Sequence, residues 1–260
     1  MKKLLTLIIL ISSFAQAQVY EIDLTTQHQT IYTPEAKEKF YGHIKDAESK
    51  KWNIEQNENP PSIDYEIFLN KDNMSISELE KINNSQNEMG SIKKSVPFLP
   101  FNKTSVNIKD GFALRPVDVY GKNYIEKAEL QNLEWKLVDE HKDILGYKTQ
   151  KAVSKFMNFD VIIWFTKEIN IDFIPAYNIK PTNGFVLEMY YIIQNDAGEM
   201  RNSIKVTSVK EINKKVSFKY PNTESGKKNN IVTSEELDKI YEEANNKRNA
   251  MYNQEGVDKK

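Results

Sequence analysis

The densest mixture of titratable side chains in the sequence is the run Asp139-Glu140-His141-Lys142-Asp143. Three carboxylates and an imidazole within five residues supply the oxygen and nitrogen ligands that divalent cations take in proteins. The run lies between two predicted strands, however, and shortly before Gly146, where a solvated polar turn is the commoner structure. We therefore interpret the run as a turn, with a cation site as the alternative.

The other residues that commonly carry chemistry form no known motif. His28, His43 and His141 are far apart in the sequence and share no spacing typical of a metal site. The sequence has no phosphate-binding loop, no nucleophile elbow, no His-Glu-x-x-His motif and no dinucleotide-binding glycine pattern. Because cysteine is absent, disulfides, thiolate metal sites and a cysteine nucleophile are excluded. We predict no catalytic, cofactor-binding or metal-binding residues, and no cofactor.

Residues 1–17 have the pattern of a secretory signal peptide. Two lysines precede the apolar run Leu4–Phe14, and Ala15-Gln16-Ala17 fits a cleavage site with small residues. The apolar run is too short to act as a membrane anchor. We predict cleavage after Ala17, Gln18 as the first residue, and a protein exported to the periplasm or out of the cell without a transmembrane anchor.

Charge is nearly balanced, with 36 Lys and Arg residues against 37 Asp and Glu residues. Loss of the two lysines of the signal peptide would move the net charge from −1 to −3. This balance argues against a nucleic-acid-binding protein and against a polybasic membrane surface. We expect residues 18–248 to form one β-rich domain, followed by a frayed polar tail over residues 249–260.

Most of the chain has the pattern of an antiparallel β protein, because short apolar runs follow one another with turn residues between them. This spacing favours antiparallel meanders over βαβ units. The predicted fold class is mainly β with a minor α+β character: a curved antiparallel sheet or half-barrel with one or two covering helices and a C-terminal helix. The predicted strands are Val19–Tyr32, Ile63–Leu69, Val117–Glu126, Leu133–Glu140, Ile144–Phe156, Phe159–Thr166, Phe185–Gln194, Ile204–Ile212 and Val216–Tyr220.

Capping and turn residues mark the helices and loops. Thr33-Pro34 predicts a helix start, and Thr233-x-x-Glu236 is a capping box that begins the C-terminal helix. Ser77 is expected to cap a short helix through Leu79 and Ile82. The clearest turns are 195–198 and 180–184.

The segment from Ile144 to Thr166 predicts a central hairpin with its turn near Met157-Asn158. Its second strand places Val161, Ile163 and Phe165 on one face, with Ile162 and Trp164 on the other. A strand that is apolar on both faces is expected to be covered on both faces. We therefore predict that Trp164 and Trp135 pack in the core, whereas Trp52 borders a polar segment and is the better candidate for an exposed contact.

The same segment resembles the central pattern of the GLPGLI family, secreted proteins common in Bacteroidetes whose role is not established. Where that family has Gly-Leu-Pro-Gly-Leu-Ile, this sequence has Pro181 to Val186, and only Gly184 matches. More distantly, the expected architecture looks like the N-terminal β-rich, bowl-shaped module of a flavobacterial peptide-N-glycanase, which implies a binding or accessory role. The residues that carry the GLPGLI resemblance, taken as structural, are Trp135, Gly146, Tyr147, Lys151, Ala152, Trp164, Phe165, Thr166 and Gly184.

Three functions are compatible with these features. The lack of a catalytic motif favours a secreted or periplasmic module that is not an enzyme, and that binds an envelope protein or an apolar or peptide ligand in its concave face. The first alternative is a structural or assembly protein of the envelope. The second is a hydrolase that uses a carboxylate pair without a sequence signature. Nucleic acid is not expected as a partner.

Overall fold

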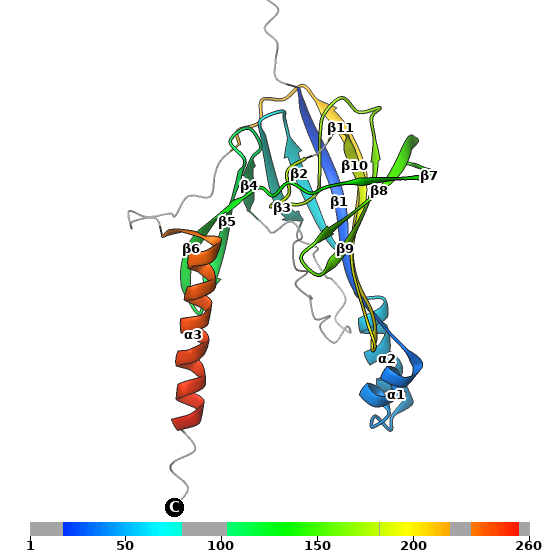
Figure 1. The fold of residues 1–260 in the computed structure, drawn as a ribbon, viewed down its shortest axis with the longest axis vertical. Coiled ribbons are helices and arrows are strands. Elements are labelled where there is room, and N and C mark those ends of the chain that lie inside the picture. Colours follow the sequence, from blue (N-terminus) through cyan, green and yellow to red (C-terminus); the bar gives the residue numbers. More distant parts are fainter. Residues whose placement is uncertain (1–17, 80–102, 182, 219–229, 255–260) are drawn as a thin grey trace, which may run out of the picture.

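One open β-sheet organises the protein (Figure 1). The computed structural model describes residues 18–79, 103–181, 183–218 and 230–254, so the predicted signal peptide lies outside the described residues. The predicted fold class, a mainly β protein with a curved sheet and a C-terminal helix, is confirmed. The strands are β1 (Val19–Tyr32), β2 (Ile63–Leu69), β3 (Asn73–Leu79), β4 (Thr104–Asn107), β5 (Phe112–Val119), β6 (Lys122–Glu129), β7 (Lys136–Ile144), β8 (Tyr147–Phe156), β9 (Phe159–Thr166), β10 (Phe185–Asn195), β11 (Gly198–Ile212) and β12 (Ile231–Thr233).

The strand order is β12-β6-β5-β4-β3-β2-β1-β11-β10-β9-β8-β7. Neighbouring strands are antiparallel except β12, which runs parallel to β6. At the centre, β1 pairs with β11 along its whole length, from Val19 opposite Ile212 to Tyr32 opposite Gly198. This antiparallel meander is the arrangement that short spacing between strands predicts.

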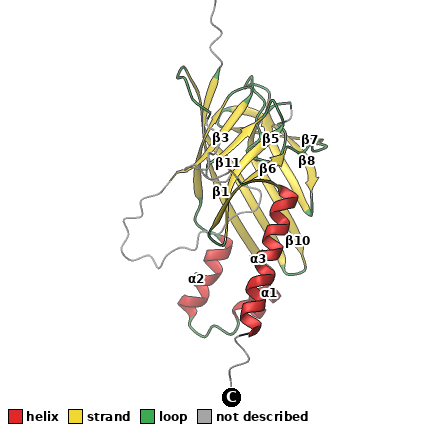
Figure 2. Ribbon diagram, turned by 90° about the vertical axis from the view of Figure 1, so that its left-hand side faces the viewer, coloured by secondary structure: helices red, strands yellow, loops and turns green. Residues whose placement is uncertain are grey.

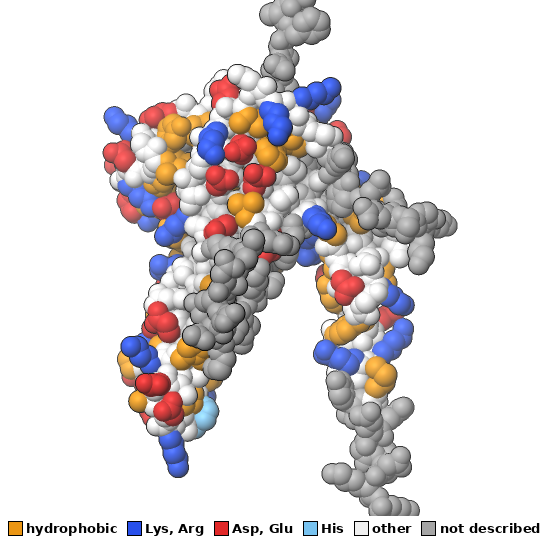
Figure 3. All heavy atoms as spheres, turned by 180° about the vertical axis from the view of Figure 1, so that it is seen from behind, with side chains coloured by type: hydrophobic (Ala, Val, Ile, Leu, Met, Phe, Trp, Pro, Cys, Tyr) orange, Lys and Arg blue, Asp and Glu red, His pale blue; other side chains and the backbone are white. Residues whose placement is uncertain are grey.

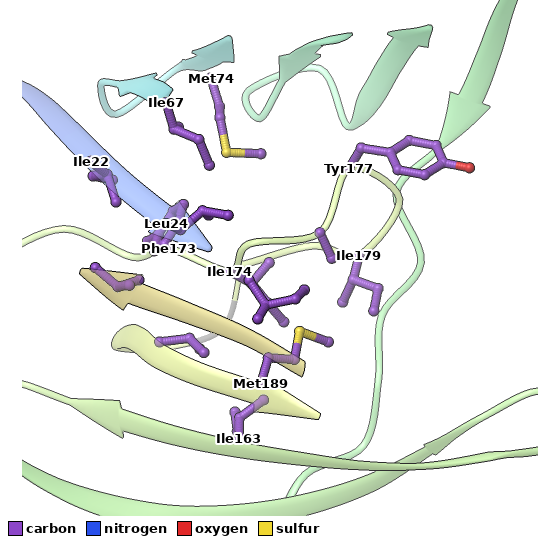
Figure 4. Packing of buried hydrophobic residues seen from close by; sticks show 14 of the residues in the cluster. Ile22, Leu24, Ile67, Met74, Ile163, Phe173, Ile174, Tyr177, Ile179 and Met189 are labelled. Atoms are coloured by element: carbon purple, nitrogen blue, oxygen red, sulfur yellow. The ribbon is translucent and has the colours of Figure 1, made fainter. Parts of the chain in front are cut away.

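The concave side of the sheet is filled by the connection between β9 and β10. Phe173, Ile174 and Ile179 of this connection are fully buried. They pack in one cluster with side chains from both halves of the sheet, for example from β2 and β3 in one half and from β9 and β10 in the other. Figure 4 shows Ile67 and Met74 on one side of them and Ile163 and Met189 on the other. The chain itself thus occupies the concave face that we expected to receive an apolar ligand.

Backbone hydrogen bonds fix this connection at both ends. The amide of Gln131 donates to the carbonyl of Asn178 at 2.9 Å, and the amide of Lys180 donates back to the carbonyl of Gln131 at 2.9 Å. At the other end, Phe173 donates to the carbonyl of Gly184 and accepts from the amide of Val186, each at 3.0 Å. Because its polar backbone groups are paired in this way, the segment can enter the core without the cost of unsatisfied donors.

The three helices lie beyond the ends of the sheet instead of covering its faces, and they project in the same direction (Figure 2). They are α1 (Pro34–Tyr41), α2 (Ala47–Glu58) and α3 (Ser234–Gln254). Both predicted helix starts are confirmed. The hydroxyl of Thr33 accepts the amide of Ala36 at 3.2 Å, and Thr233 exchanges two hydrogen bonds with Glu236 at 2.8 and 3.2 Å.

Apolar side chains remain exposed on the helical ends of the molecule (Figure 3). Phe40 of α1 is 44% exposed and Trp52 of α2 is 37% exposed, which confirms the expected exposure of Trp52. Helix α2 has no buried residue, whereas α3 buries Leu237 against Val117 and Val119 of β5. Among the described residues, no helix has the length and hydropathy needed to cross a membrane.

Two tight turns lie at other places than predicted. Tyr120 and Gly121 both have positive φ, 49° and 82°, and they turn the predicted strand 117–126 into the hairpin β5–β6. Leu145 and Gly146, at 52° and 83°, form the turn between β7 and β8, inside the predicted strand 144–156 and beyond the turn expected at 139–143. Two successive residues with positive φ give the turn whose twist matches antiparallel strands, and glycine in the second position lowers its cost.

Three further local predictions were wrong. The run 139–143 is not a turn, because it lies within β7, next to an irregularity in the pairing with β8 between Val138 and His141. Ser77 and Leu79 of the expected short helix belong to strand β3, in which Met74 and Ile76 alternate into the core, and Ile82 lies outside the described residues. Residues 216–218 of the expected last strand are irregular, and residues 219–220 lie outside the described residues.

Candidate functional site

A cleft of about 880 Å³ opens where several loops meet at one end of the sheet. Its walls come from the β2–β3 turn, the β4–β5 turn and both ends of the β9–β10 connection, and Gln18 lies at its edge. Ile108, Ile169 and Ile171 provide apolar surface. The remaining lining side chains are mostly charged residues and amides, so the cleft combines apolar contact area with many hydrogen-bonding groups.

Hydrogen bonds between the turns build the first wall of the cleft. The side-chain oxygen of Asn70 accepts the amides of Asp72 and Asn73 at 2.9 and 2.7 Å, which closes the β2–β3 turn. The carbonyl of Asp72 then accepts the amides of Ile108 at 2.8 Å and Lys109 at 3.2 Å. The β2–β3 and β4–β5 turns are therefore held together, and Lys71 and Asp72 have a fixed position beside Ile108.

Gly184 and Asp172 build the opposite wall. The amide of Gly184 donates to Oδ1 of Asp172 at 2.8 Å. Gly184 has a φ of +144°, and a β-carbon there would lie 2.7 Å from the ring of Phe165 and 3.0 Å from the carbonyl oxygen of Thr166. Only glycine fits this combination of positive φ and close approach.

Ammonium groups outnumber carboxylates in the cleft. Lys71, Lys167 and Lys180 line it together with Asp72 and Asp172, and all five side chains are exposed. The amides of Gln18, Asn170 and Asn183 add donors and acceptors. This set suits a ligand that has many hydroxyl or amide groups and an excess of negative charge.

Similarity to known proteins extends over most of the chain. Residues 67–235 match the family described as "N-glycanase peptide, N-terminal domain", of the N-glycanase PNGase F-II. The chain belongs to this family. The predicted membership of the GLPGLI family is wrong, because the match over residues 67–235 assigns the chain elsewhere.

The PNGase F-II N-terminal domain family also overturns the function favoured from the sequence. The favoured function was a module that is not an enzyme and that binds an envelope protein or an apolar or peptide ligand, whereas a family named for an N-glycanase points to a function related to glycans. The more distant resemblance to the N-terminal module of a peptide-N-glycanase pointed to the correct family.

Two solved structures are similar to this member of the PNGase F-II N-terminal domain family. They are "Structure of PNGF-II in C2 space group", at 18% identity and a TM-score of 0.48, and "Structure of PNGF-II in P21 space group", at 19% and 0.47. Each similarity covers 88% of this chain but only 33% and 34% of the solved chains, so this chain spans about a third of their length. No curated protein matches the sequence.

Of the residues singled out from the sequence, Phe165, Thr166 and Gly184 come together beside the cleft. Gly184 lines it, and Phe165 and Thr166 form the surface against which Gly184 packs. Thr166 is buried, and its hydroxyl accepts the amide of Glu168 at 3.1 Å. These three residues of the PNGase F-II N-terminal domain fold therefore support the cleft and do not present functional groups to it.

The other singled-out residues lie away from the cleft. Gly146 is in the β7–β8 turn and Ala152 faces the core. Trp135 and Tyr147 are half-buried at the edge of the core cluster. Lys151 lies opposite Trp164 in the β8–β9 pair. The residues that carried the GLPGLI resemblance thus lie in different places: in a turn, in the core and on the outer face of the sheet.

Trp164 is only half-buried, which corrects the prediction that it packs in the core. Its ring lies under two lysines, with Nζ of Lys142 at 4.4 Å and Nζ of Lys151 at 6.0 Å from the ring centroid. Lys142 also pairs with Glu188, which accepts the hydroxyl of Tyr190 at 2.7 Å. Burial raises the pKa of Tyr190 above its ordinary value. This network covers the outer face of β9 with paired side chains.

No metal site is formed by the histidines or by the acidic run in β7. Within the part of the chain that the structure describes, no group of three or more His, Asp or Glu side chains is arranged to hold a metal ion. The closest approach in the run is 3.7 Å between Nδ1 of His141 and Asp139, and both side chains are largely exposed. The ring of His28 instead contacts the side-chain oxygen of Asn202 on the neighbouring strand.

The sequence analysis missed the residues that line the cleft. Lys71 and Asp72 lie in a short turn, and Asn170 and Asp172 lie in a connection without regular structure. Residues in turns and irregular connections show neither the helical nor the strand periodicity by which elements are predicted from a sequence. The only part of the cleft with a sequence signal was the turn 180–184, whose Pro, Asn and Gly residues predicted a loop but not a site.

Proposed function

We propose that this chain recognises N-glycosylated polypeptides and that it does so in the polar cleft. The observation that carries the proposal is the match to the N-terminal domain of an N-glycanase over residues 67–235. The matched segment includes the cleft residues Lys71, Asp72, Asp172 and Lys180. The family and the site therefore concern the same part of the chain.

The chemistry of the cleft supports a glycan as the ligand. Sugar hydroxyls both donate and accept hydrogen bonds, and the carboxylates, amides and ammonium groups of the cleft offer partners of both kinds. The apolar surface of Ile108, Ile169 and Ile171 can receive the C–H groups of a sugar ring or of a peptide. An open cleft of about 880 Å³ leaves room for more than one sugar unit.

Export is part of the proposal, because glycosylated polypeptides are found mainly outside the bacterial cytoplasm or at host surfaces. We propose that residues 1–17 act as a signal peptide that is removed after Ala17. Gln18 would then be the first residue, at the edge of the cleft. N-terminal sequencing of the protein from its source cell should begin at Gln18, and a mature protein that retains Met1 would refute this step.

Isothermal titration calorimetry with matched peptides tests the proposed recognition. The probes are a peptide that carries an N-linked glycan and the same peptide without it. We expect saturable binding of the glycopeptide only. Asn170→Ala, which removes an exposed amide of the cleft, should weaken binding, whereas Asn246→Ala on the exposed face of α3 should not. Equal behaviour of the two peptides would reject the proposal.

A further inference from the structure

Three lysines border the cleft without a carboxylate partner among the described residues. Lys71 is in the β2–β3 turn, Lys167 follows β9 directly, and Lys180 lies shortly before β10. None of the three takes part in an ion pair with another described residue, although ion pairs are common elsewhere on the surface. Examples of such pairs are Lys37–Glu58, Lys151–Glu140, Lys155–Asp160 and Lys210–Glu21.

Two carboxylates, those of Asp72 and Asp172, line the cleft beside the three ammonium groups. Oδ1 of Asp172 accepts the amide of Gly184 at 2.8 Å, and the carbonyl of Asp72 ties the β2–β3 and β4–β5 turns together. Neither carboxylate forms an ion pair with a described residue. With three positive side chains against two negative ones, the described lining of the cleft is net positive in a protein whose overall charge is −1.

The placement of the three lysines favours an anionic ligand. They come from separate segments of the chain, at positions 71, 167 and 180, and all three line one cleft that also has an apolar wall. Like charges that border one cleft repel one another, and an anion that binds between them relieves the repulsion. Because the three side chains are exposed, this attraction is modest and is screened by salt.

We propose that the cleft binds the negatively charged group of an acidic glycan, either the carboxylate of a sugar acid or a phosphate ester. This inference rests on the proposed function and names the class of glycan. Lysine ammonium groups are compact charges with three donors each, and they bind such anions without requiring one fixed orientation. A neutral glycan would leave the excess of ammonium groups over carboxylates in the described lining of the cleft without a counter-charge.

Two matched pairs of glycopeptides test the inference by calorimetry. The first pair is a sialylated N-glycopeptide and its product after sialidase treatment. The second is an N-glycopeptide with phosphorylated mannose and its product after phosphatase treatment. In each pair, only the acidic group differs. We expect the acidic member to bind about tenfold more tightly at low ionic strength, and the preference to decrease as salt screens the charges.

Lysine variants test whether the preference for the acidic glycopeptide arises in the cleft. The variant Lys71→Gln/Lys167→Gln/Lys180→Gln should lose the preference for the acidic member, so that the acidic and trimmed members bind it with equal affinity. Because all three lysines are exposed, the substitutions should leave the fold intact. Lys51→Gln, on the exposed surface of α2, is the matched control and should keep the full preference. A preference in one pair only identifies the sugar acid or the phosphate ester as the recognised group.

The outcomes of the calorimetry distinguish a failure of the acidic-glycan inference from a failure of the proposed function. If acidic and trimmed glycopeptides bind equally well, and both bind more tightly than the bare peptide, the acidic group is not recognised but the proposed function stands. If no glycopeptide binds more tightly than the bare peptide, both proposals are wrong. A preference for the acidic member that survives in the triple lysine variant would place the anion outside the cleft and overturn the inference.

Discussion

The amide of Gly184 donates a hydrogen bond to Oδ1 of Asp172 at 2.8 Å, and this bond joins the two ends of the β9–β10 connection. Between these residues the chain enters the concave side of the sheet, where Phe173 and Ile174 are fully buried. The same pair forms one wall of the cleft. This contact therefore links the segment that fills the core to the wall of the candidate site.

Gly184→Val should destabilise the protein. The substitution places a β-carbon at positive φ and against the ring of Phe165, so we expect a loss of about 1–3 kcal/mol in the free energy of unfolding. Asn183→Ala, at the exposed neighbouring position, should cost much less. Urea denaturation of both variants measures the difference. Equal midpoints for Gly184→Val and the wild type would show that the close approach is not required.

Glu126→Gln should destabilise the attachment of the β5–β6 hairpin to the rest of the protein. Oε2 of Glu126 accepts Nε of Arg115 at 2.6 Å, and Oε1 accepts the hydroxyl of Ser234 at 2.8 Å. The guanidinium also lies 5.4 Å from the ring centroid of Tyr177 in the β9–β10 connection. Removing the charge of a pair this buried should cost about 3 kcal/mol.

A solvent-exposed ion pair provides the control for that change. Lys155 and Asp160 are 2.8 Å apart, and their side chains are 82% and 60% exposed. Lys155→Gln should therefore cost no more than about 1 kcal/mol. Thermal unfolding followed by circular dichroism compares the two variants. A Glu126→Gln protein that unfolds at the same temperature as Lys155→Gln would mean that the buried pair adds no more than the exposed one.

Alkaline pH should destabilise the protein through Tyr65. Burial and, to a lesser extent, the charge of Glu78 raise the pKa of Tyr65 from 10.0 to about 12. The folded state thus binds the phenolic proton more tightly than the unfolded state. The resulting stabilisation is complete below pH 10.0, decreases as pH rises, and is lost once pH passes about 12.

Tyr65→Phe isolates this contribution, because phenylalanine keeps the buried ring and removes the titrating hydroxyl. Between pH 10.0 and about 12, the stability of the variant should fall less steeply than that of the wild type. Urea midpoints measured at several pH values give both slopes. Parallel pH dependences would show that Tyr65 does not titrate differently in the folded and unfolded states.

The strands and helix starts could be predicted because their signals are local. In Ile63–Leu69, every second residue from Tyr65 is buried, and the burial follows the alternation in the sequence. The capping box at Thr233 and Glu236 forms the expected pair of hydrogen bonds. In such cases the residues that define the element are neighbours in the chain.

The division of strands by short turns and the filling of the concave face could not be predicted in the same way. Tyr120 is a common strand residue, and only its conformation, with a φ of 49°, reveals the turn. The burial of Phe173 depends on strands more than 90 residues away, such as β2 and β3. The cleft depends on the meeting of Lys71 with Lys167 and Lys180, which only the folded chain brings together.

Mapping of a bound glycopeptide by backbone amide chemical shifts tests the central claim most directly. Titration of an N-glycopeptide into isotopically labelled protein should shift the amides of Lys71, Asp72, Asn170, Asp172 and Gly184, with the peptide lacking its glycan as the reference. Shifts at these residues that saturate with the glycopeptide alone are the predicted result. Shifts confined to the α1–α2 segment or to the outer face around Trp164, or no shifts, would contradict glycan recognition in the cleft.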